Sequence, residues 1–126
     1  MSKIKLEKMK FHAYHGCLEH EKRDGNTFLV TVIMDINTAK AEQTDLLDDT
    51  LNYQLVYDLV KAEMAIPSEL IEHIGRRILD GILTQFAQVK SATVHLSKLN
   101  PPLGGNVQSV SIELSGESSE YNRVRP

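Results

Sequence analysis

Four residues whose side chains can move protons or bind a polar ligand lie at the predicted ends of secondary-structure elements. They are Glu21, Tyr53, Glu72 and Lys98. A lysine and a carboxylate can serve as general acid and base, and a tyrosine hydroxyl can relay a proton. An ionised carboxylate also accepts two adjacent N–H donors side by side. These residues form a site only if the fold brings them together.

Three of these residues also have an ordinary structural explanation. Glu21 lies in a charged run over residues 19–24, which is typical of a solvated loop. Tyr53 can pack in the first turn of a helix with its hydroxyl in water. Glu72 is stabilised near a helix N-terminus by about 0.3–1 kcal/mol without any ligand. Taken separately, none of these three positions is decisive.

Lys98 has the most informative position in the chain. Apolar residues at 92, 94 and 96 alternate along a predicted strand, and Lys98 continues the same face. The double proline at 101–102 then restricts the backbone that leaves the strand. We expect Lys98 to lie at the rim of a buried face. A solvated lysine that blocks edge pairing is the alternative.

Six predicted elements must position these residues. Apolar alternation predicts strands over residues 4–14, 27–38, 90–98 and 107–114, and helical spacing predicts helices over 53–65 and 68–86. In the first strand the apolar phase changes, which predicts a bulge near Glu7–Lys8. Asn52 and Ser68 are the expected N-caps of the two helices. Residues 15–26 are expected to form a loop, and residues 38–50 a loop with one helical turn.

The predicted element order is strand, strand, helix, helix, strand, strand. It favours an α+β fold, a two-layer sandwich in which two helices cover one face of a four-stranded antiparallel sheet. We expect one domain over residues 1–115 and a flexible tail over residues 116–126, which has little apolar content. Two edge strands and an uncovered sheet face favour self-association.

Composition argues against several classes of function. The 126 residues are 41% hydrophobic and 25% charged, and no apolar run is long enough to span a membrane. A net charge of −3 argues against nucleic-acid binding. The first residues lack the features of a signal peptide, so we expect a cytoplasmic protein. The single Cys17 and the scattered histidines predict no disulfide, no metal site and no cofactor.

His15 is the best placed of the five histidines for contact with a ligand. Gly16 beside it permits a tight turn and the close approach of a bound molecule. A buried, hydrogen-bonded histidine with a structural role is at least as well supported, and both alternatives stay open.

The chain closely resembles the dihydroneopterin aldolases of folate biosynthesis over residues 4–114. The resemblance rests on four segments in this order and spacing: FHAYHGCLEHEKRDGNTFLVTV, DTLNYQLVYDLV, LIEHIGRRILDGIL and VHLSKLNPPLGG. It implies the tunnelling fold, in which subunits assemble into barrel-like rings. It also implies a homo-oligomer, a tetramer or an octamer, with active sites between subunits.

The active residues of this family correspond without a gap to the four residues named above. The resemblance implies a carbon–carbon lyase that cleaves 7,8-dihydroneopterin, by a retro-aldol reaction, into 6-hydroxymethyl-7,8-dihydropterin and glycolaldehyde. Lys98 is expected to act as acid and base with help from Tyr53 and Glu21, which also contact the substrate, while Glu72 and its neighbour Ile71 bind the pterin. Because the C6=N5 imine of the substrate accepts the electrons, neither a metal ion nor a lysine Schiff base is needed.

Two alternatives to the aldolase remain. An epimerase of dihydroneopterin or its triphosphate would use the same residues, and a triphosphate would need extra cations, for which Lys22, Arg23, Arg76 and Arg77 are available. A non-catalytic pterin-binding oligomeric module would be expected to lack at least one of the four site residues. All four are present, which argues against that module.

Overall fold

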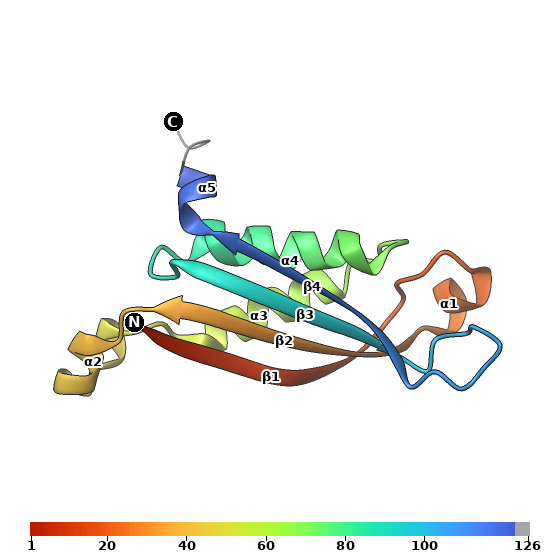
Figure 1. The fold of residues 1–126 in the computed structure, drawn as a ribbon, viewed down its shortest axis with the longest axis horizontal. Helices are drawn as coiled ribbons and strands as arrows, with labels where there is room; N and C mark the ends of the chain where they lie inside the picture. Colours follow the sequence, from red (N-terminus) through yellow and green to blue (C-terminus); the bar gives the residue numbers. More distant parts are fainter. Residues whose placement is uncertain (123–126) are drawn as a thin grey trace.

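The computed structural model describes residues 1–122, which form a four-stranded antiparallel sheet with helices on one face (Figure 1). The strands are neighbours in chain order: β1 (Ser2–Ala13), β2 (Asn26–Ile36), β3 (Ser91–Leu99) and β4 (Ser109–Glu117). Two longer helices, α3 (Tyr53–Met64) and α4 (Ile71–Gln85), lie between β2 and β3 in the sequence. The predicted element order and the two-layer α+β sandwich are confirmed.

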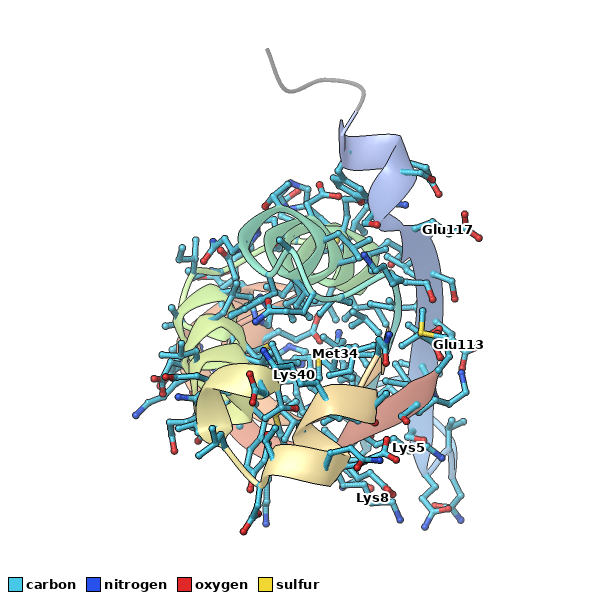
Figure 2. All side chains as sticks on the ribbon, turned by 90° about the vertical axis from the view of Figure 1, so that its left-hand side faces the viewer. Lys5, Lys8, Met34, Lys40, Glu113 and Glu117 are labelled. Atoms are coloured by element: carbon cyan, nitrogen blue, oxygen red, sulfur yellow. The ribbon has the colours of Figure 1, made fainter. Side chains whose placement is uncertain are left out.

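The core lies between the sheet and these two helices. Val30, Val32 and Met34 of β2 have no exposed surface, as their alternation predicts, and Figure 2 shows Met34 in the interior. Ile74 and Ile78 of α4 are equally buried and lie about one turn apart. Burial of each such side chain stabilises the fold by about 1.5–3 kcal/mol. These contacts fix the orientation of α4 on the sheet.

β1 contains the predicted bulge. Its register with β2 shifts between Leu6 and Met9. Lys8 has a φ of 53°, in the left-handed region that residues other than glycine rarely adopt. The backbone N–H of Lys8 donates to Thr31 Oγ1 at 2.9 Å. The bulge changes the phase of the strand, so that Met9 and Ala13 lie in the core.

Short helices occupy one segment expected to be a loop and one expected to be a loop with a single helical turn. The connection over 15–26 contains α1 (Glu19–Asp24), and the segment over 38–50 contains α2 (Ala39–Thr44) and a 3-10 turn, η1 (Leu47–Asp49). None of the three is longer than six residues. The apolar periodicity that identifies a longer helix does not develop over so few residues.

α4 begins later than predicted, because its N-cap is Leu70 and not Ser68. The hydroxyl of Ser68 has other partners. Ser68 Oγ is hydrogen-bonded to His73 Nδ1 at 2.7 Å and accepts from Arg77 Nη2 at 3.0 Å. Ser68 therefore belongs to the segment that leads into α4.

Ordered structure continues past residue 115. β4 ends at Glu117, and a short helix, α5 (Ser118–Asn122), follows it. Tyr121 Oη donates to Asp80 Oδ1 at 2.5 Å, which ties α5 to α4. The predicted domain boundary therefore falls inside β4 and is corrected. The last part of the predicted flexible tail, residues 123–126, lies outside the described residues.

Candidate active site

One end of the sheet gathers most of the predicted site. β1 and β3 run toward this end, and β2 and β4 leave from it. α1 and the first turn of α4 lie at the same end, on the right-hand side of Figure 1. Glu21, Glu72 and Lys98 belong to these elements. The fold therefore places three of the four predicted residues at one end of the molecule.

Lys98 and Glu21 form a buried ion pair at this end. Lys98 Nζ donates to Glu21 Oε2 at 2.7 Å, and the two side chains are 12% and 7% exposed. Lys98 continues the core-facing row of β3, in which Leu96 is fully buried. The prediction that Lys98 lies at the rim of a buried face is confirmed. The solvated alternatives for Lys98 and for Glu21 are wrong.

Glu21 is held by a second hydrogen bond, which its Oε1 accepts from the backbone N–H of Leu18 at 3.3 Å. Burial by itself raises the pKa of Glu21. The hydrogen bond from Lys98, the Leu18 amide and the charge of Lys98 outweigh that effect and hold the pKa below its ordinary value. The carboxylate is therefore ionised at neutral pH.

Gly16 leaves the space that the Glu21 carboxylate occupies. A Cβ atom at this position would lie 2.5 Å from both Cδ and Oε1 of Glu21. The φ of Gly16, 152°, also lies in a region that L side chains rarely adopt. Only glycine therefore fits beside the ion pair without a shift of the backbone or of Glu21. In the sequence, the only sign that position 16 requires glycine is the dipeptide His15–Gly16.

His15 is fully buried, and its Nδ1 accepts a hydrogen bond from the backbone N–H of Ser68 at 2.9 Å. Burial and the charge of Arg77 lower its pKa to about 4; the Met64 carbonyl opposes this and the charge of Lys98 adds to it. The ring is therefore neutral at physiological pH. Of the two alternatives for this residue, the buried, hydrogen-bonded histidine is confirmed.

Arg77 holds the segment 65–70, which joins α3 to α4, by hydrogen bonds. Its guanidinium donates to the carbonyl oxygens of Glu63 at 3.1 Å and Ile66 at 2.7 Å. It also forms an ion pair with Glu63 Oε1 at 2.7 Å and donates to Ser68 Oγ at 3.0 Å. From the sequence Arg77 is only one of four cations available for a triphosphate, because contacts of this kind leave no local pattern.

Glu72 lies in the first turn of α4 with an exposed side chain. Among the described residues, no hydrogen bond or ion pair engages its carboxylate. Leu70, the N-cap, supplies no side-chain hydrogen bond to the helix end. The side chain of Ile71 is buried in the core, so Ile71 has only its backbone to offer a ligand. The Glu72 carboxylate is free to accept donors from a bound molecule.

Tyr53 lies far from the other three residues. It begins α3 after Asn52, which caps the helix through its side chain as predicted. The residue is 60% exposed. α3 has 12 residues, a length of about 17 Å, and its other end, at Met64, lies near His15. A single chain does not bring Tyr53 to Lys98.

Two adjoining hollows lie on either side of the 67–69 segment. One, of about 360 Å³, lies between this segment and Gly16 and Lys22. The other, of about 390 Å³, lies between this segment and His73. Within the described part of the chain, neither hollow is lined by any of the four predicted residues. Neither hollow of a single chain therefore gathers them.

Comparison with known proteins decides the family. The sequence model described as "FolB: Dihydroneopterin aldolase" matches residues 4–115. The chain belongs to the dihydroneopterin aldolase family. A dihydroneopterin aldolase of Bacillus subtilis is 36% identical over 123 residues, which cover 94% of this chain and 100% of that relative.

Two solved structures of dihydroneopterin aldolases share the fold. The Escherichia coli enzyme in complex with neopterin has a TM-score of 0.85 and 17% identity, and the match covers 92% of this chain and 99% of that one. The Burkholderia thailendensis enzyme bound to guanine has a TM-score of 0.75 and 16% identity, with 92% and 90% covered. At such low identity the likeness shows the fold alone, which agrees with the fold class predicted from the sequence.

Membership of the dihydroneopterin aldolase family makes this chain a carbon–carbon lyase and fits retro-aldol cleavage in folate biosynthesis. Over residues 1–122, no group of three or more histidine, cysteine, aspartate or glutamate side chains could hold a metal ion. No helix in that range is long and apolar enough to cross a membrane.

Proposed function

We propose that this chain cleaves 7,8-dihydroneopterin into 6-hydroxymethyl-7,8-dihydropterin and glycolaldehyde, and that Lys98 is the acid–base catalyst. The buried ion pair of Lys98 with Glu21, at the same end of the sheet as Glu72, supports this proposal best. A lysine held by a carboxylate at the rim of the core has a fixed position and limited access to water. Both conditions favour directed proton transfer.

Glu72 is proposed as the anchor of the pterin ring. A pterin presents its N3–H and 2-amino donors next to each other, and an ionised carboxylate can accept both. The Glu72 carboxylate is exposed, lies near the positive end of α4 and has no partner among the described residues. Guanine, which is bound to the Burkholderia enzyme, presents the same pair of adjacent donors. A free carboxylate at this position therefore suits either ring.

The substrate itself supplies the electron sink for the reaction. After its ammonium has released one proton to solvent, Lys98, directly or through water, takes the proton from the 2′-hydroxyl as the bond between C1′ and C2′ breaks. The electrons of that bond move to the C6=N5 imine, and C1′ then receives a proton. Tyr53 delivers this proton, while Glu21 orients Lys98 and the side-chain hydroxyls. The lysine transfers protons and forms no covalent bond to the substrate.

The complete site is proposed to form between two copies of the chain, because Tyr53 lies about one α3 length from the end that holds Lys98. The two edge strands offer complementary charges for such an assembly. Lys5 on β1 and Glu113 and Glu117 on β4 are exposed on the same uncovered face of the sheet, at opposite edges (Figure 2). Pairing β1 of one copy with β4 of the next would close a barrel-like ring, a tetramer or an octamer of stacked rings.

The cations considered for a triphosphate all have acidic partners in the structure. The pairs are Lys22 with Glu69, Arg23 with Asp24, Arg76 with Asp80 and Arg77 with Glu63. This arrangement supports the unphosphorylated substrate over the triphosphate. We also propose a cytoplasmic location for this protein.

Chromatography of the products after incubation with 7,8-dihydroneopterin tests the proposal. We expect 6-hydroxymethyl-7,8-dihydropterin and glycolaldehyde in equal amounts. The 2′-epimer without glycolaldehyde would show an epimerase, and unchanged substrate would contradict both enzymes. Borohydride added during turnover, followed by mass spectrometry of the protein, tests the role of Lys98. A reduced adduct on Lys98 would contradict acid–base action without a Schiff base.

A further inference from the structure

The dipeptide His15–Gly16 touches both parts of the proposed site. Gly16 leaves room for the carboxylate of Glu21, which holds Lys98. On its other side, the dipeptide holds Ser68 by two hydrogen bonds. Ser68 N–H donates to His15 Nδ1 at 2.9 Å, and Gly16 N–H donates to the Ser68 carbonyl oxygen at 3.0 Å. The same two residues therefore fix the ion pair and the segment that leads into α4.

The hydrogen bond from Ser68 defines the tautomer of His15. A backbone N–H can only donate, so Nδ1 is the acceptor and Nε2 bears the hydrogen. His15 Nε2 is buried and makes no hydrogen bond of ordinary geometry among the described residues, although the Met64 carbonyl lies near the ring. A buried donor that is satisfied this poorly costs stability. An apolar side chain would avoid that cost and could still pack against Phe28. The centroids of the Phe28 ring and the imidazole are 5.2 Å apart. What His15 adds is the acceptor for Ser68.

Ser68 is held from the opposite side as well. Arg77 Nη2 donates to its hydroxyl at 3.0 Å, and His73 Nδ1 lies 2.7 Å from the same oxygen. The Ser68 backbone and side chain are thus fixed to different parts of the chain. Glu72 follows four residues later, in the first turn of α4. A shift of Ser68 would therefore move the start of α4.

We propose that His15 is a positioning residue for pterin binding. By accepting a hydrogen bond from the Ser68 N–H, its Nδ1 fixes the segment 65–70 and with it the position of the Glu72 carboxylate. Gly16 holds the same segment in place relative to Glu21 and Lys98. The inference rests on the proposed role of Glu72 as the pterin anchor. It assigns His15 no contact with substrate, so its effect is on affinity and not on the chemical step.

Two amide variants of His15 separate the acceptor from simple packing. In His15→Asn the side-chain oxygen can occupy the place of Nδ1, whereas in His15→Gln it reaches toward the place of Nε2. We expect His15→Gln to weaken neopterin binding about tenfold, because the buried Ser68 N–H loses its acceptor. His15→Asn should stay within about threefold of the unmodified protein. His95→Gln, on the uncovered face of β3, is the matched control and should bind normally.

Isothermal titration with neopterin gives the affinities, and steady-state kinetics should show a raised KM with kcat within about threefold in His15→Gln. Hydrogen exchange at the Ser68 amide should be at least about tenfold faster in that variant than in His15→Asn. Equal affinities in the Asn and Gln variants, whether normal or weakened, would overturn the inference, because the place of the acceptor would not matter. Equal Ser68 exchange would overturn it as well.

Failure of the inference differs from failure of the proposed function. If the unmodified protein does not bind neopterin at all, the role of Glu72 is wrong, and the inference falls with it. If the unmodified protein binds neopterin and Glu72→Gln weakens binding, but His15→Gln does not, only the inference is wrong. Exchange at Ser68 is measured without ligand and reports on the hydrogen bond in either case.

Discussion

Glu21 Oε2 lies 2.7 Å from Lys98 Nζ, and both side chains are largely shielded from solvent. The two residues are 77 positions apart, so the pair joins the connection after β1 to the end of β3. A buried ion pair seldom adds net stability compared with apolar residues of similar size, but loss of one partner is costly. This relationship favours a chemical role for Lys98 and a positioning role for Glu21.

Replacement of Lys98 should abolish most turnover and also weaken the fold. In Lys98→Met we expect turnover to fall about a hundredfold or more, because the proton carrier is gone. The Glu21 carboxylate is left without its partner, which lowers the free energy of unfolding at pH 7 by about 3–5 kcal/mol. Product chromatography and thermal unfolding measure the two effects.

Lys61→Met, which removes an exposed lysine of α3, is the control for Lys98→Met and should change neither quantity. Acidification should recover part of the stability lost in Lys98→Met, because protonation neutralises Glu21. Unchanged turnover in Lys98→Met would contradict the acid–base assignment.

Glu72→Gln should weaken the binding of neopterin about ten- to hundredfold, because one charge-assisted pair of hydrogen bonds becomes neutral and loses one acceptor. The exposed side chain makes a change in fold stability unexpected. Glu69→Gln is the matched control, since Glu69 is also an exposed acid near the start of α4 but is paired with Lys22. Isothermal titration distinguishes the two variants. Equal affinities would remove Glu72 from the site.

Gly16→Ala should disturb the ion pair without any change to a charged residue. Its Cβ would lie 2.5 Å from the Glu21 carboxylate, so Glu21 or the backbone must move. We expect a loss of about 1–3 kcal/mol in the free energy of unfolding and a fall in kcat. Gly105→Ala is the control, because a Cβ at Gly105 meets nothing within 4 Å. Normal kcat in Gly16→Ala would show that the exact place of Glu21 is unimportant.

Variants of Tyr53 and Lys98 should complement each other if the site lies between copies. Tyr53→Phe and Lys98→Met are each expected to be poorly active when pure. After the two are mixed, unfolded and refolded together, about a quarter of the sites combine one intact Tyr53 with one intact Lys98 in a ring of random composition. Activity of the mixture should rise accordingly. If it equals the mean of the two pure variants, both residues act within one chain.

His15 should make stability depend on pH. Its pKa is about 4 in the folded protein, because of burial and the Arg77 charge, and 6.5 is its ordinary value. Between these values the unfolded chain binds more protons, so this contribution is complete above pH 6.5 and is lost as the pH falls toward 4. The loss amounts to about 3 kcal/mol. In His15→Asn this part of the pH dependence should be absent from urea unfolding. An equal slope in both proteins would contradict the pKa of His15.

The predictions from the sequence succeeded where the pattern is local. The alternation before Lys98 sets the face of a strand, and that face is buried wherever the sheet meets a helix layer. The phase change near Lys8 likewise requires an extra residue in β1, whatever the strand pairs with. Asn52 caps α3 through a bond to a neighbour two residues away. In each case the cause lies within a few residues of the effect.

The sequence does not predict partners that lie far apart in the chain. Ser68 has the residue type of an N-cap, but the hydroxyl is bound by Arg77 and His73, and α4 starts after Leu70. Its backbone partner, His15, is 53 residues away. The pairing of Glu21 with Lys98 likewise depends on a short helix, α1, that has no periodicity of its own. Such contacts arise from tertiary packing, which residue spacing alone does not record.

The length of α3 has a consequence for how the activity is controlled in a cell. Because this helix keeps Tyr53 away from the end that holds Lys98, a correctly folded single chain is an inactive precursor under the proposed arrangement. Newly made chains gain activity only when they meet copies of themselves, so output rises more steeply than protein abundance at low expression. A compound that blocks the contact between copies would inhibit the enzyme without any likeness to a pterin.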